Sequence, residues 1–575
     1  MEKTWKARPC PPQNAIENLQ QTLNVDYTVA FLLAQRSIHT FDESRAFFRP
    51  DLNQLHDPFL MKDMDRAVDR LTLAIHNQEN ILIYGDYDVD GTTAVTLVYS
   101  FLKQLGAHCL YYIPDRYKEG YGFSFTGVDF ARDNNCSLII TLDCGVRDGQ
   151  KIDYARSLNI DVIVCDHHQP AEIPKATAIL DPKRPDCSYP YKGLSGAGVG
   201  FKLLQALCIQ QSIDIETLYQ YLDLVTISIG ADIVPLTGEN RILAFHGLTL
   251  LQHEQRPGIA AMLSKAGFEK DALTITDVVF ILAPRINAAG RIFSGKEAVA
   301  LLLAENEEEA LPLSTAIEEF NKTRKGLDKD ITAEAIAFIQ GDEFHQNSLS
   351  TVVYGNDWHK GVVGIVAARL VEAFYKPTIV MVNDGEKMAG SARSIEGIDL
   401  FECLSECEEH LIQFGGHTMA AGLSLKAENF EAFRQRFDDV IREKLRNIRP
   451  TPVLQYDAEI EFAQITPKLY RVLKQFEPFG PENLSPVFLA RNCKNARFTR
   501  TVGEEKNHLK LHLNQAHAPK ISMDGIGFDL GHWADKLKND QSVDILFALN
   551  ENTWNNKTTI QLLVKDIRES TETAS

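Results

Sequence analysis

Three short apolar runs in this 575-residue chain each end in a carboxylate, and this repeated pattern constrains the fold more than any other feature of the sequence. The runs span residues 80–86, 138–143 and 161–166 and end at Asp86, Asp143 and Asp166. Short β-branched runs of this kind are typical of buried strands in a parallel sheet. Ligands of such sheets bind just beyond the carboxyl ends of the strands. We therefore expect the acids to converge at one edge of a sheet.

The residues that follow these runs indicate a metal site. The first run continues as Asp86-Tyr-Asp-Val-Asp-Gly91 and the third as Asp166-His167-His168. Several carboxylates crowded at one edge repel one another unless some hold protons or divalent cations neutralise them. Carboxylate oxygens favour hard ions and imidazole suits transition metals, so a mixed Asp/His set favours Mn²⁺ or Mg²⁺ over a thiolate zinc site. Mn²⁺ is the first choice.

Two simpler interpretations of the acidic motif stay open. Asp86-x-Asp88-x-Asp90-Gly91 matches the opening of an EF-hand calcium loop, but its twelfth position, where an acid closes the cage, is Leu97. The motif also follows an apparent strand rather than a helix. One or two of the carboxylates could instead cap helices. Six such residues at three strand ends are harder to explain as caps.

The length of the chain predicts three or four domains. Alternation of strand and helix patterns predicts an α/β fold: a doubly wound parallel sheet, long connecting helices, a second smaller α/β domain and a C-terminal OB-like β-barrel. The expected boundaries are a helical lead-in at 1–60, the doubly wound domain at 61–240, a helical connector at 241–345, the second α/β domain at 346–450 and a nucleic-acid-binding barrel at 451–575.

Two segments have ambiguous patterns. The glycine-rich turn at residues 194–200 suits phosphate binding and close helix packing equally well. Residues 222–229 form an apolar run that periodicity cannot assign to helix or strand. In either conformation Asp232, which follows this run, adds a fourth carboxylate near the cluster if the chain folds back onto the sheet.

Charge and composition exclude few classes of function. The net charge of −19 argues against a polyanionic partner, yet residues 452–575 hold 15 basic and 16 acidic side chains, so the acid excess lies in the first part of the chain. No apolar run approaches a membrane span, and the first residues lack the apolar segment of a signal peptide. The ten cysteines include no CxxC pair. We expect a soluble, cytoplasmic protein that makes no membrane contact.

Taken in order, these motifs resemble those of the DHH phosphoesterase superfamily. The resemblance rests on Asp86-Tyr-Asp-Val-Asp-Gly91, Asp143, Asp166-His-His168, Asp232 and, from the DHH-associated C-terminal domain, Gly415-Gly-His417. With the stretch Pro284-Arg-Ile-Asn-Ala-Ala-Gly-Arg291 and the C-terminal barrel, the chain resembles the bacterial single-strand-specific 5′-to-3′ DNA exonucleases over residues 60 to 570. That resemblance implies a role in DNA repair and recombination.

The resemblance also implies a catalytic centre with two divalent ions. The ligands it implies are Asp88, Asp90, Asp143, His167 and Asp232, with Asp86 and His168 assisting them. Such a centre would activate water for phosphodiester hydrolysis, and no serine or cysteine nucleophile is needed. His168 could donate to a phosphate oxygen, although a histidine that only satisfies the core is the simpler interpretation.

Further residues bear on the substrate. Ile113-Pro-Asp-Arg116 and Gly390-Ser-Ala-Arg-Ser394 resemble segments that contact a 5′ phosphate, which gives Arg116, Ser391 and Arg393 that role. Arg285, Asn287 and Arg291, in an apparent Gly/Ala-rich turn, suit the scissile or an adjacent phosphate, and His417 is expected to face the cleft. Surface salt bridges are the simpler interpretation of the arginines.

Three classes of function remain. The first is a metal-dependent exonuclease on single-stranded DNA, in which the basic stretch 491–500 either follows the strand or is only a solvated strand face. The second is hydrolysis of short oligoribonucleotides, cyclic dinucleotides or pyrophosphate by the same chemistry. The third is a non-catalytic binding protein, which the intact motifs argue against. A helicase and a single-strand-binding protein are the partners implied by the resemblance, and we expect a monomer.

Overall fold

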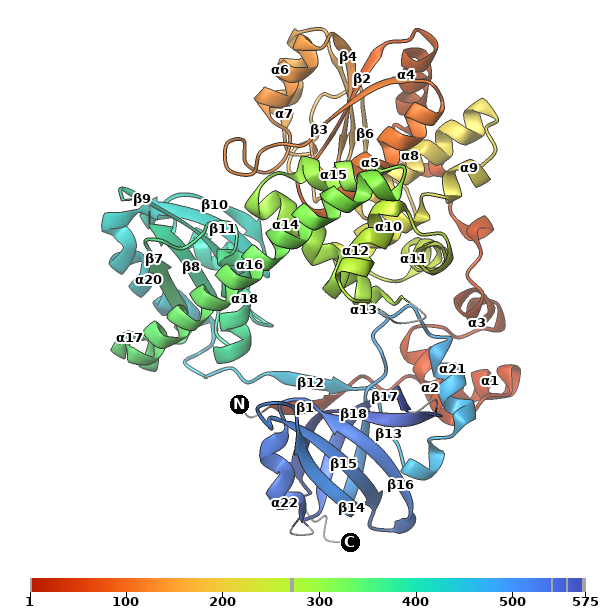
Figure 1. The fold of residues 1–575 in the computed structure, drawn as a ribbon, viewed down its shortest axis with the longest axis vertical. Coiled ribbons are helices and arrows are strands. Elements are labelled where there is room, and N and C mark those ends of the chain that lie inside the picture. The colour runs from red at the N-terminus through yellow and green to blue at the C-terminus, as the bar shows by residue number, and fades with distance from the viewer. Residues whose placement is uncertain (1–2, 269–272, 384, 539–540, 555–556, 571–575) are drawn as a thin grey trace.

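The computed structural model describes residues 3–268, 273–383, 385–538, 541–554 and 557–570. Figure 1 shows the first sheet and its helices at the top, a second sheet at the side and a barrel at the bottom, with the long helix α16 (Glu307–Gly341) running between the two upper bodies. No described helix is both long and apolar enough to cross a membrane.

The first sheet is fully parallel, and its strand order defines the candidate site. Its strands lie in the order β3-β2-β4-β5-β6. Their bounds are β2 (Asn80–Gly85), β3 (His108–Tyr112), β4 (Cys136–Leu142), β5 (Asp161–Cys165) and β6 (Ala178–Leu180). The chain runs from β2 outward to β3 and then returns past β2 to β4, so the direction of winding reverses between β2 and β4. The doubly wound sheet is confirmed.

Helices cover both faces of this sheet, as near-continuous apolar strands require. Alternate residues of β2 separate accordingly: Ile81 and Ile83 pack with α5 and α8, while Leu82 and Tyr84 pack with α6 and α7. The flanking helices are α4 (Met64–His76), α5 (Val89–Gln104), α6 (Phe125–Asp133), α7 (Gly149–Ser157) and α8 (Gly196–Gln211).

The helices that follow extend the first core. They are α9 (Glu216–Tyr219), α10 (Leu222–Ala231), α11 (Gly238–His253), α12 (Pro257–Lys265), α13 (Ile275–Asp277), the π-turn η3 (Val278–Leu282), α14 (Ala283–Ile292), α15 (Gly295–Leu303), α16 (Glu307–Gly341) and α17 (Glu343–Asn347). Residues 222–229 are thus helical, and the turn expected around residues 284–291 is instead the helix α14. Buried residues as far as Ile317 share the core of the first sheet, whereas Ile331 and Ile339 of α16 pack on the second.

The second lobe is a mixed sheet in the order β10-β11-β9-β8-β7, in which only β7 and β8 pair in parallel. Its elements are β7 (Thr351–Gly355), α18 (Val363–Phe374), β8 (Thr378–Asn383), β9 (Lys387–Arg393), α19 (Leu400–Ser405), β10 (Leu411–His417), β11 (Ala420–Lys426) and α20 (Phe430–Lys444).

The C-terminal region forms the expected closed barrel. Five strands pair in the ring β14-β15-β16-β18-β17, which pairing of β14 with β17 closes. The elements are β12 (Val453–Tyr456), β13 (Ala458–Glu459), α21 (Pro467–Lys474), β14 (Phe488–Val502), β15 (His508–Gln515), β16 (Ala518–Gly527), α22 (Ala534–Lys538), β17 (Val543–Trp554) and β18 (Lys557–Glu569).

The N-terminal segment packs on this barrel and does not only lead into the first sheet. It contains the strand β1 (Thr4–Ala7) as well as α1 (Gln13–Leu23), α2 (Tyr27–Gln35) and α3 (Phe41–Phe48). β1 pairs in parallel with β12, and Ile16, Leu32 and Leu33 share one apolar core with Phe488 and Phe547 of the barrel. The apolar side chains of α1 and α2 are therefore covered by the barrel.

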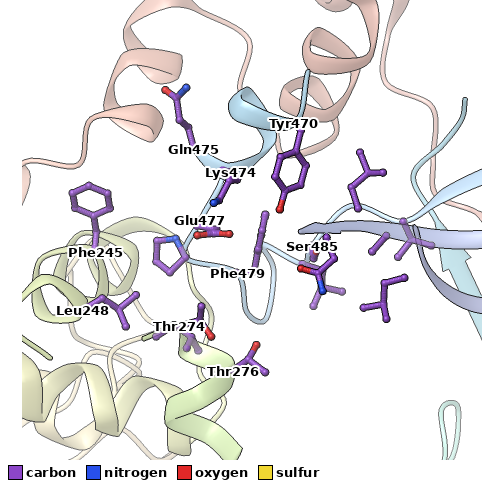
Figure 2. A pocket seen from close by; sticks show the side chains of 18 of the residues that line it. Phe245, Leu248, Thr274, Thr276, Tyr470, Lys474, Gln475, Glu477, Phe479 and Ser485 are labelled. Atoms are coloured by element: carbon purple, nitrogen blue, oxygen red, sulfur yellow. The ribbon is translucent and has the colours of Figure 1, made fainter. Parts of the chain in front are cut away.

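A large cavity lies where the barrel meets the helices of the first lobe. It measures about 1140 Å³ and mixes aromatic and basic side chains. Figure 2 shows Phe245 and Leu248 of α11 on one side and Tyr470, Lys474 and Phe479 of the barrel region on the other. The separate bodies of the molecule therefore leave an open space at their junction.

Candidate functional site

The carboxylates meet at the point where the first sheet reverses its winding. Asp86 directly follows β2 and Asp143 directly follows β4, and these two strands are neighbours. A crevice forms at such a point because the flanking loops leave in opposite directions, and ligands of doubly wound sheets bind there. Asp166 follows β5 in the same way, and its amide continues the ladder to Leu180 at 3.0 Å.

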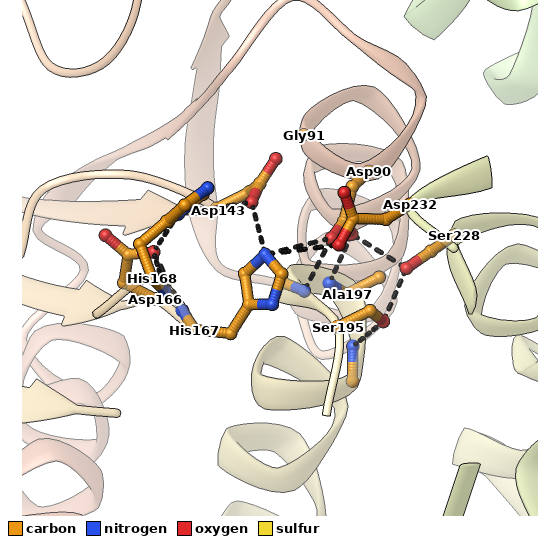
Figure 3. A network of polar contacts seen from close by, with 12 residues as sticks. Asp90, Gly91, Asp143, Asp166, His167, His168, Ser195, Ala197, Ser228 and Asp232 are labelled. Carbon is orange, nitrogen blue, oxygen red and sulfur yellow. Dashed lines mark hydrogen bonds and ion pairs between the residues drawn. The ribbon is translucent and has the colours of Figure 1, made fainter. Parts of the chain in front are cut away.

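His167 lies at the centre of the cluster, as Figure 3 shows. Its Nε2 is 3.2 Å from Asp143 Oδ1, 3.5 Å from Asp232 Oδ2 and 3.7 Å from Asp90 Oδ2. Asp232 reaches this place from the C-terminal end of α10, so the chain does fold back onto the sheet. The buried imidazole is therefore surrounded by carboxylates from three separate elements.

Asp90 is held by a cradle of donors. The amides of Gly196 and Ala197, at the start of α8, donate to its two oxygens at 2.7 and 2.8 Å, and Ser228 Oγ donates at 2.7 Å. A Cβ on Gly196 would lie 2.6 Å from Asp143 Cβ, so only glycine lets α8 approach this closely. The glycine-rich segment thus serves close packing, and its helix terminus binds a carboxylate of the chain itself.

Asp86 and Asp88 occupy different environments. Asp88 accepts a hydrogen bond from the Gly91 amide at 3.1 Å and caps α5, so the capping interpretation holds for this residue. Asp86 is fully buried; its Oδ1 accepts a long contact of 3.4 Å from the Gly122 amide, and its Oδ2 has no partner. The structure brings both acids to the same sheet edge.

His168 is oriented from two sides. Its Nδ1 lies 2.7 Å from Asp166 Oδ1, and its Nε2 lies 3.0 Å from the hydroxyl of Tyr121. Asp166 also accepts hydrogen bonds from the amides of Val146, His167 and His168. A carboxylate that holds a histidine in one orientation is a common partner of histidines at metal sites. His168 is therefore held in place by this network and is not merely a core residue.

The buried carboxylates of the cluster disfavour one another's charged form. Burial, followed by the neighbouring carboxylates, raises the pKa of Asp143 and of Asp86 well above the usual range. The same causes raise the pKa of Asp232 to about 8. Burial lowers the pKa of His167 to about 4, so this imidazole is neutral at pH 7 and free to act as a ligand. Asp166 differs: burial acts to raise its pKa, but the hydrogen bond and charge of His168, together with the Val146 amide and His167, outweigh burial and lower that pKa.

The residues fit a site for divalent cations. Within the described chain, no lysine or arginine lies within ion-pair distance of Asp86, Asp90, Asp143 or Asp232. Buried atoms that make no hydrogen bond include Asp86 Oδ2, Asp143 Oδ1 and both ring nitrogens of His167. Two groups of ligand atoms are close enough to bind an ion: Asp143, His167 and His168 form one, and Asp90, His167 and Asp232 form the other. Oxygen and imidazole donors of this kind suit Mn²⁺ or Mg²⁺.

An arginine cluster adjoins the acids. Burial and then the charges of Arg116 and Arg393 lower the pKa of Arg291 to about 10, and burial and Arg116 lower the pKa of Arg393. None of the three has a carboxylate within 4 Å in the described parts of the chain. Arg116 lies over the ring of Tyr87 at 4.9 Å, and Arg291 donates to the Gly361 carbonyl at 3.0 Å. Three mutually repelling guanidinium groups form a strong site for an anion.

The second lobe contributes Ser391, Arg393 and the start of α18 to this cluster. A Cβ on Gly364, in the first turn of α18, would lie 2.9 Å from Arg393 Nη2 and 3.3 Å from Ser391 Oγ. Both side chains therefore lie against the N-terminal end of a helix, where unpaired amides and the helix dipole favour negative charge. The structure brings Arg116, Arg291, Ser391 and Arg393 together from three separate segments.

Three other predicted residues have different surroundings. Arg285 pairs with Glu318 of α16, with Nε 2.7 Å from Oε2, and it also donates to the Ile281 carbonyl. Its role at a phosphate stays a prediction, although its described contacts are those of a structural ion pair. Asn287 is half-buried on α14, one turn before Arg291. His417, at the end of β10, is exposed; partial burial and then Arg147, His168 and Lys183 of the first lobe lower its pKa, so it faces that lobe.

Sequence reasoning missed several residues that build the site. Ser228, Ser195 and the amides of α8 hold Asp90, and the only signal in the sequence was a serine before a run of small residues. Asp166 belonged to the recognised motif, but its function in orienting His168 was not foreseen. Nothing in the sequence pointed to Tyr121, because its contact with His168 spans 47 positions and depends on the conformation of a loop.

Comparison with known proteins agrees with this geometry. Residues 80–229 match the DHH family N-terminal domain, residues 346–443 the DHHA1 domain and residues 456–566 the RecJ OB domain. The single-stranded-DNA-specific exonuclease RecJ of Bacillus subtilis is 38% identical over 559 residues, which cover 97% of this chain and 70% of the relative. The RecJ of Escherichia coli is 34% identical over 532 residues, or 88% of this chain and 90% of the relative.

A solved structure shares the whole architecture. The crystal structure of RecJ in complex with Mn²⁺ from Thermus thermophilus superposes with a TM-score of 0.84 at 26% identity and covers 99% of this chain and 80% of that one. The similarity includes all three matched domains and is not limited to the acidic motifs. This chain belongs to the RecJ family of DHH phosphoesterases.

Proposed function

We propose that this protein is a single-stranded-DNA-specific exonuclease that degrades strands in the 5′-to-3′ direction with Mn²⁺ or Mg²⁺ as its cofactor, in DNA repair and recombination. The observation that carries the proposal is the adjacency of two uncompensated clusters, the acids of the first lobe and the arginines Arg116, Arg291 and Arg393. Curated relatives along the length of the chain are named single-stranded-DNA-specific exonucleases, and a related structure holds Mn²⁺.

The residues divide the work of hydrolysis. Asp86, Asp88, Asp90, Asp143, His167 and Asp232 would hold two divalent ions, which when bound supply an activated water and stabilise charge on both the attacking and the leaving oxygen. His168, oriented by Asp166, can donate a hydrogen bond to a phosphate oxygen of the substrate. The α8 amides keep Asp90 in place and prevent it from turning away from the site. No described serine or cysteine needs to act as a nucleophile.

The arginine cluster would give the enzyme its polarity. A terminal phosphate carries more negative charge than an internal phosphodiester, so a site with three guanidinium groups and a helix N-terminus prefers a phosphorylated strand end. Because the cluster adjoins the acids, a 5′ phosphate bound there would place a bond near the end of the strand at the metal centre. Ser391 would add a hydroxyl donor to the same site, and Asn287 and His417 would line the approach to it.

The cavity beside the barrel is a candidate surface for more distant parts of the strand. Its wall contains aromatic side chains, including Phe245, Tyr470 and Phe479 (Figure 2). It also contains the basic side chains of Arg49 and Lys474. Aromatic rings stack with bases of any sequence, and basic groups follow the backbone. This combination suits a single strand without sequence preference.

The test compares 5′-phosphorylated with 5′-hydroxyl single strands as substrates. We expect the native enzyme to favour the phosphorylated strand, and Arg393→Ala or Arg116→Ala to reduce that preference by about ten- to hundredfold through KM, since a charge-assisted hydrogen bond contributes about 1.5 to 3 kcal/mol. Arg393→Lys should restore little, because lysine cannot bind phosphate oxygens with two parallel donors.

The matched control is Arg446→Gln, which removes an exposed arginine outside the site. Equal digestion of both strands by the native enzyme, or an unchanged preference in both alanine variants, would refute the end-binding role. Degradation of duplex or of short RNA in preference to single-stranded DNA would refute the substrate class.

The proposal extends to the partners, the cellular location and the oligomeric state of the protein. An enzyme limited to single strands needs another protein to open the duplex, so we infer that a helicase supplies its substrate and that a single-strand-binding protein coats it. We also infer that the enzyme works in the cytoplasm and as a monomer.

A further inference from the structure

A second cavity, far from the acids in the sequence, lies where the second lobe joins the linker to the barrel. It measures about 530 Å³, within the range of sites for small ligands, which is roughly 300 to 1,000 Å³. Its wall comes from three places: the end of α16 with α17, the end of α18 with Lys376, and the linker residues 449–451. We refer to it as the linker cavity.

Lys376 brings a buried positive charge to this cavity. The residue is only 7% exposed, yet no carboxylate lies within ion-pair distance of its ammonium in the described chain. Its Nζ donates to the His345 carbonyl at 2.9 Å and so uses one of three possible donors. Burial, followed by the charge of Arg449, lowers its pKa to about 8. A buried ammonium with spare donors and no counterion is costly without a ligand.

Arg449 supplies a second cation from the linker. It lies on the exposed linker and makes no hydrogen bond or ion pair with other described residues. The nearby acids are already engaged, because Asp438 accepts from Arg442 and from the Ser350 region, while Asp342 binds His345 and Arg434. The wall itself contains no aspartate or glutamate among the described residues. In a chain with a net charge of −19, this is an unusual concentration of unpaired positive charge.

The remaining wall is apolar or neutral. Ile339, Phe374 and Pro450 offer surfaces against which a flat ring can pack, and Gln340 and Gln346 offer amide groups. An inorganic anion alone would leave most of the space unfilled. The cavity therefore combines the two features that a phosphorylated small molecule requires, a cationic end and an apolar body.

We propose that the linker cavity binds a phosphate monoester of mononucleotide size, with the phosphate at Lys376 and Arg449 and the organic group against Phe374. A ligand there would connect the second lobe to the linker and would thereby restrain the second lobe relative to the barrel. The site lies outside the metal centre and the arginine cluster, and the proposal stands on charge and volume without the proposed function.

The experiment measures ligand binding in the presence of EDTA, so that no hydrolysis occurs. The full chain carries Arg116→Ala and Arg393→Ala, which remove the other phosphate site. Titration calorimetry with deoxyadenosine 5′-monophosphate, inorganic phosphate and deoxyadenosine separates the possible ligands. We expect one binding site for the nucleotide, weaker binding of phosphate, and none of the nucleoside.

Two variants test the assignment on that background. Arg449→Gln should weaken nucleotide binding by about ten- to hundredfold, because it removes a charge-assisted hydrogen bond. Lys376→Met keeps the aliphatic stem and should weaken binding equally, without lowering the unfolding midpoint of the ligand-free protein. Arg446→Gln, which removes a nearby arginine outside the cavity, should leave binding unchanged.

Several outcomes of these titrations would overturn the proposal or part of it. No nucleotide binding, or binding that survives both Arg449→Gln and Lys376→Met, would overturn the proposal. Phosphate binding as tight as that of the nucleotide would show that the apolar wall contributes nothing and would overturn the assignment of ligand size. Loss of strand preference in the Arg393 variants bears only on the proposed function, so the two failures are distinguishable.

Discussion

The acidic cluster and the arginine cluster adjoin, but they are built in opposite ways. The acids are held within one lobe, on strand ends and helix termini whose positions follow from a single sheet. The arginines come from three segments, on a loop of the first lobe, on α14 and on β9 of the second lobe. Only the second cluster depends on how two lobes sit against each other.

This difference separates chemistry from recognition. The metal centre keeps its geometry as long as the first sheet is intact, because Asp90 and His168 are fixed by hydrogen bonds inside that lobe. The phosphate site is complete only when Arg393 and the start of α18 lie against Arg291. Substitutions in the first cluster should therefore change metal binding and turnover together, whereas those in the second should change substrate affinity alone.

The largest effect is expected for Asp143→Asn. Activity should fall by about a thousandfold or more, because metal assistance supplies several kcal/mol of transition-state stabilisation. Without metal, the variant should nevertheless be more stable than the metal-free native protein by about 1 to 3 kcal/mol. The reason is that a neutral amide replaces a buried carboxylate that has no counterion. Thermal unfolding with and without Mn²⁺ measures both effects.

Addition of Mn²⁺ should raise the stability of the native protein by about 2.7 kcal/mol at a hundred times the Kd, and should stabilise the variant far less. Asp133→Asn is the control, because this acid is exposed at the end of α6. A variant that keeps its response to Mn²⁺ would remove Asp143 from the ligand set and weaken the contrast between the clusters.

Asp166→Asn should have an intermediate effect. The amide cannot hold His168 Nδ1 as strongly as the carboxylate does, and loss of such an orienting partner lowers metal affinity or activity by about ten- to hundredfold. The measurements are Mn²⁺ affinity and kcat. The preference for a 5′ phosphate should stay unchanged, because Asp166 lies outside the arginine cluster; a shift in that preference would show that the two clusters are coupled.

Gly364→Ala is expected to have the smallest effect. Its new methyl group would lie 2.9 Å from Arg393 Nη2, so the flexible guanidinium must move. We expect KM for a phosphorylated strand to rise a few-fold, about 0.5 to 1 kcal/mol, with kcat unchanged. Gly326→Ala on α16 is the matched control, because a Cβ there meets no atom within 4 Å. A change in kcat for Gly364→Ala would contradict the division between recognition and chemistry.

Much of the first cluster could be predicted from sequence. Apolar runs that end in Asp86, Asp143 and Asp166 predict strands, and the carboxyl ends of parallel strands must share one edge. The order of the strands could not be predicted, because no sequence pattern indicates that β4 pairs with β2. That crossing is what creates the crevice in which Asp86 and Asp143 meet.

Long-range pairings could not be predicted. The ion pair of Arg285 with Glu318 is one example, because it depends on the packing of α14 against α16. The segment 284–291 begins with a proline and contains a glycine, a pattern typical of a turn, but packing makes it a helix. The N-terminal strand β1 pairs with β12, more than 440 residues away, and no local sequence pattern predicts such a contact.

That last pairing also has a consequence for synthesis on the ribosome. Residues 4–38 find their strand partner and much of their apolar cover only in residues 453–567, which are made more than 400 residues later. At a synthesis rate of about 5 to 20 residues per second, their apolar faces stay uncovered for on the order of half a minute to two minutes. Residues 4–38 are thus buried long after they have emerged from the ribosome, and this delay makes them a natural point of contact for chaperones in a growing cell.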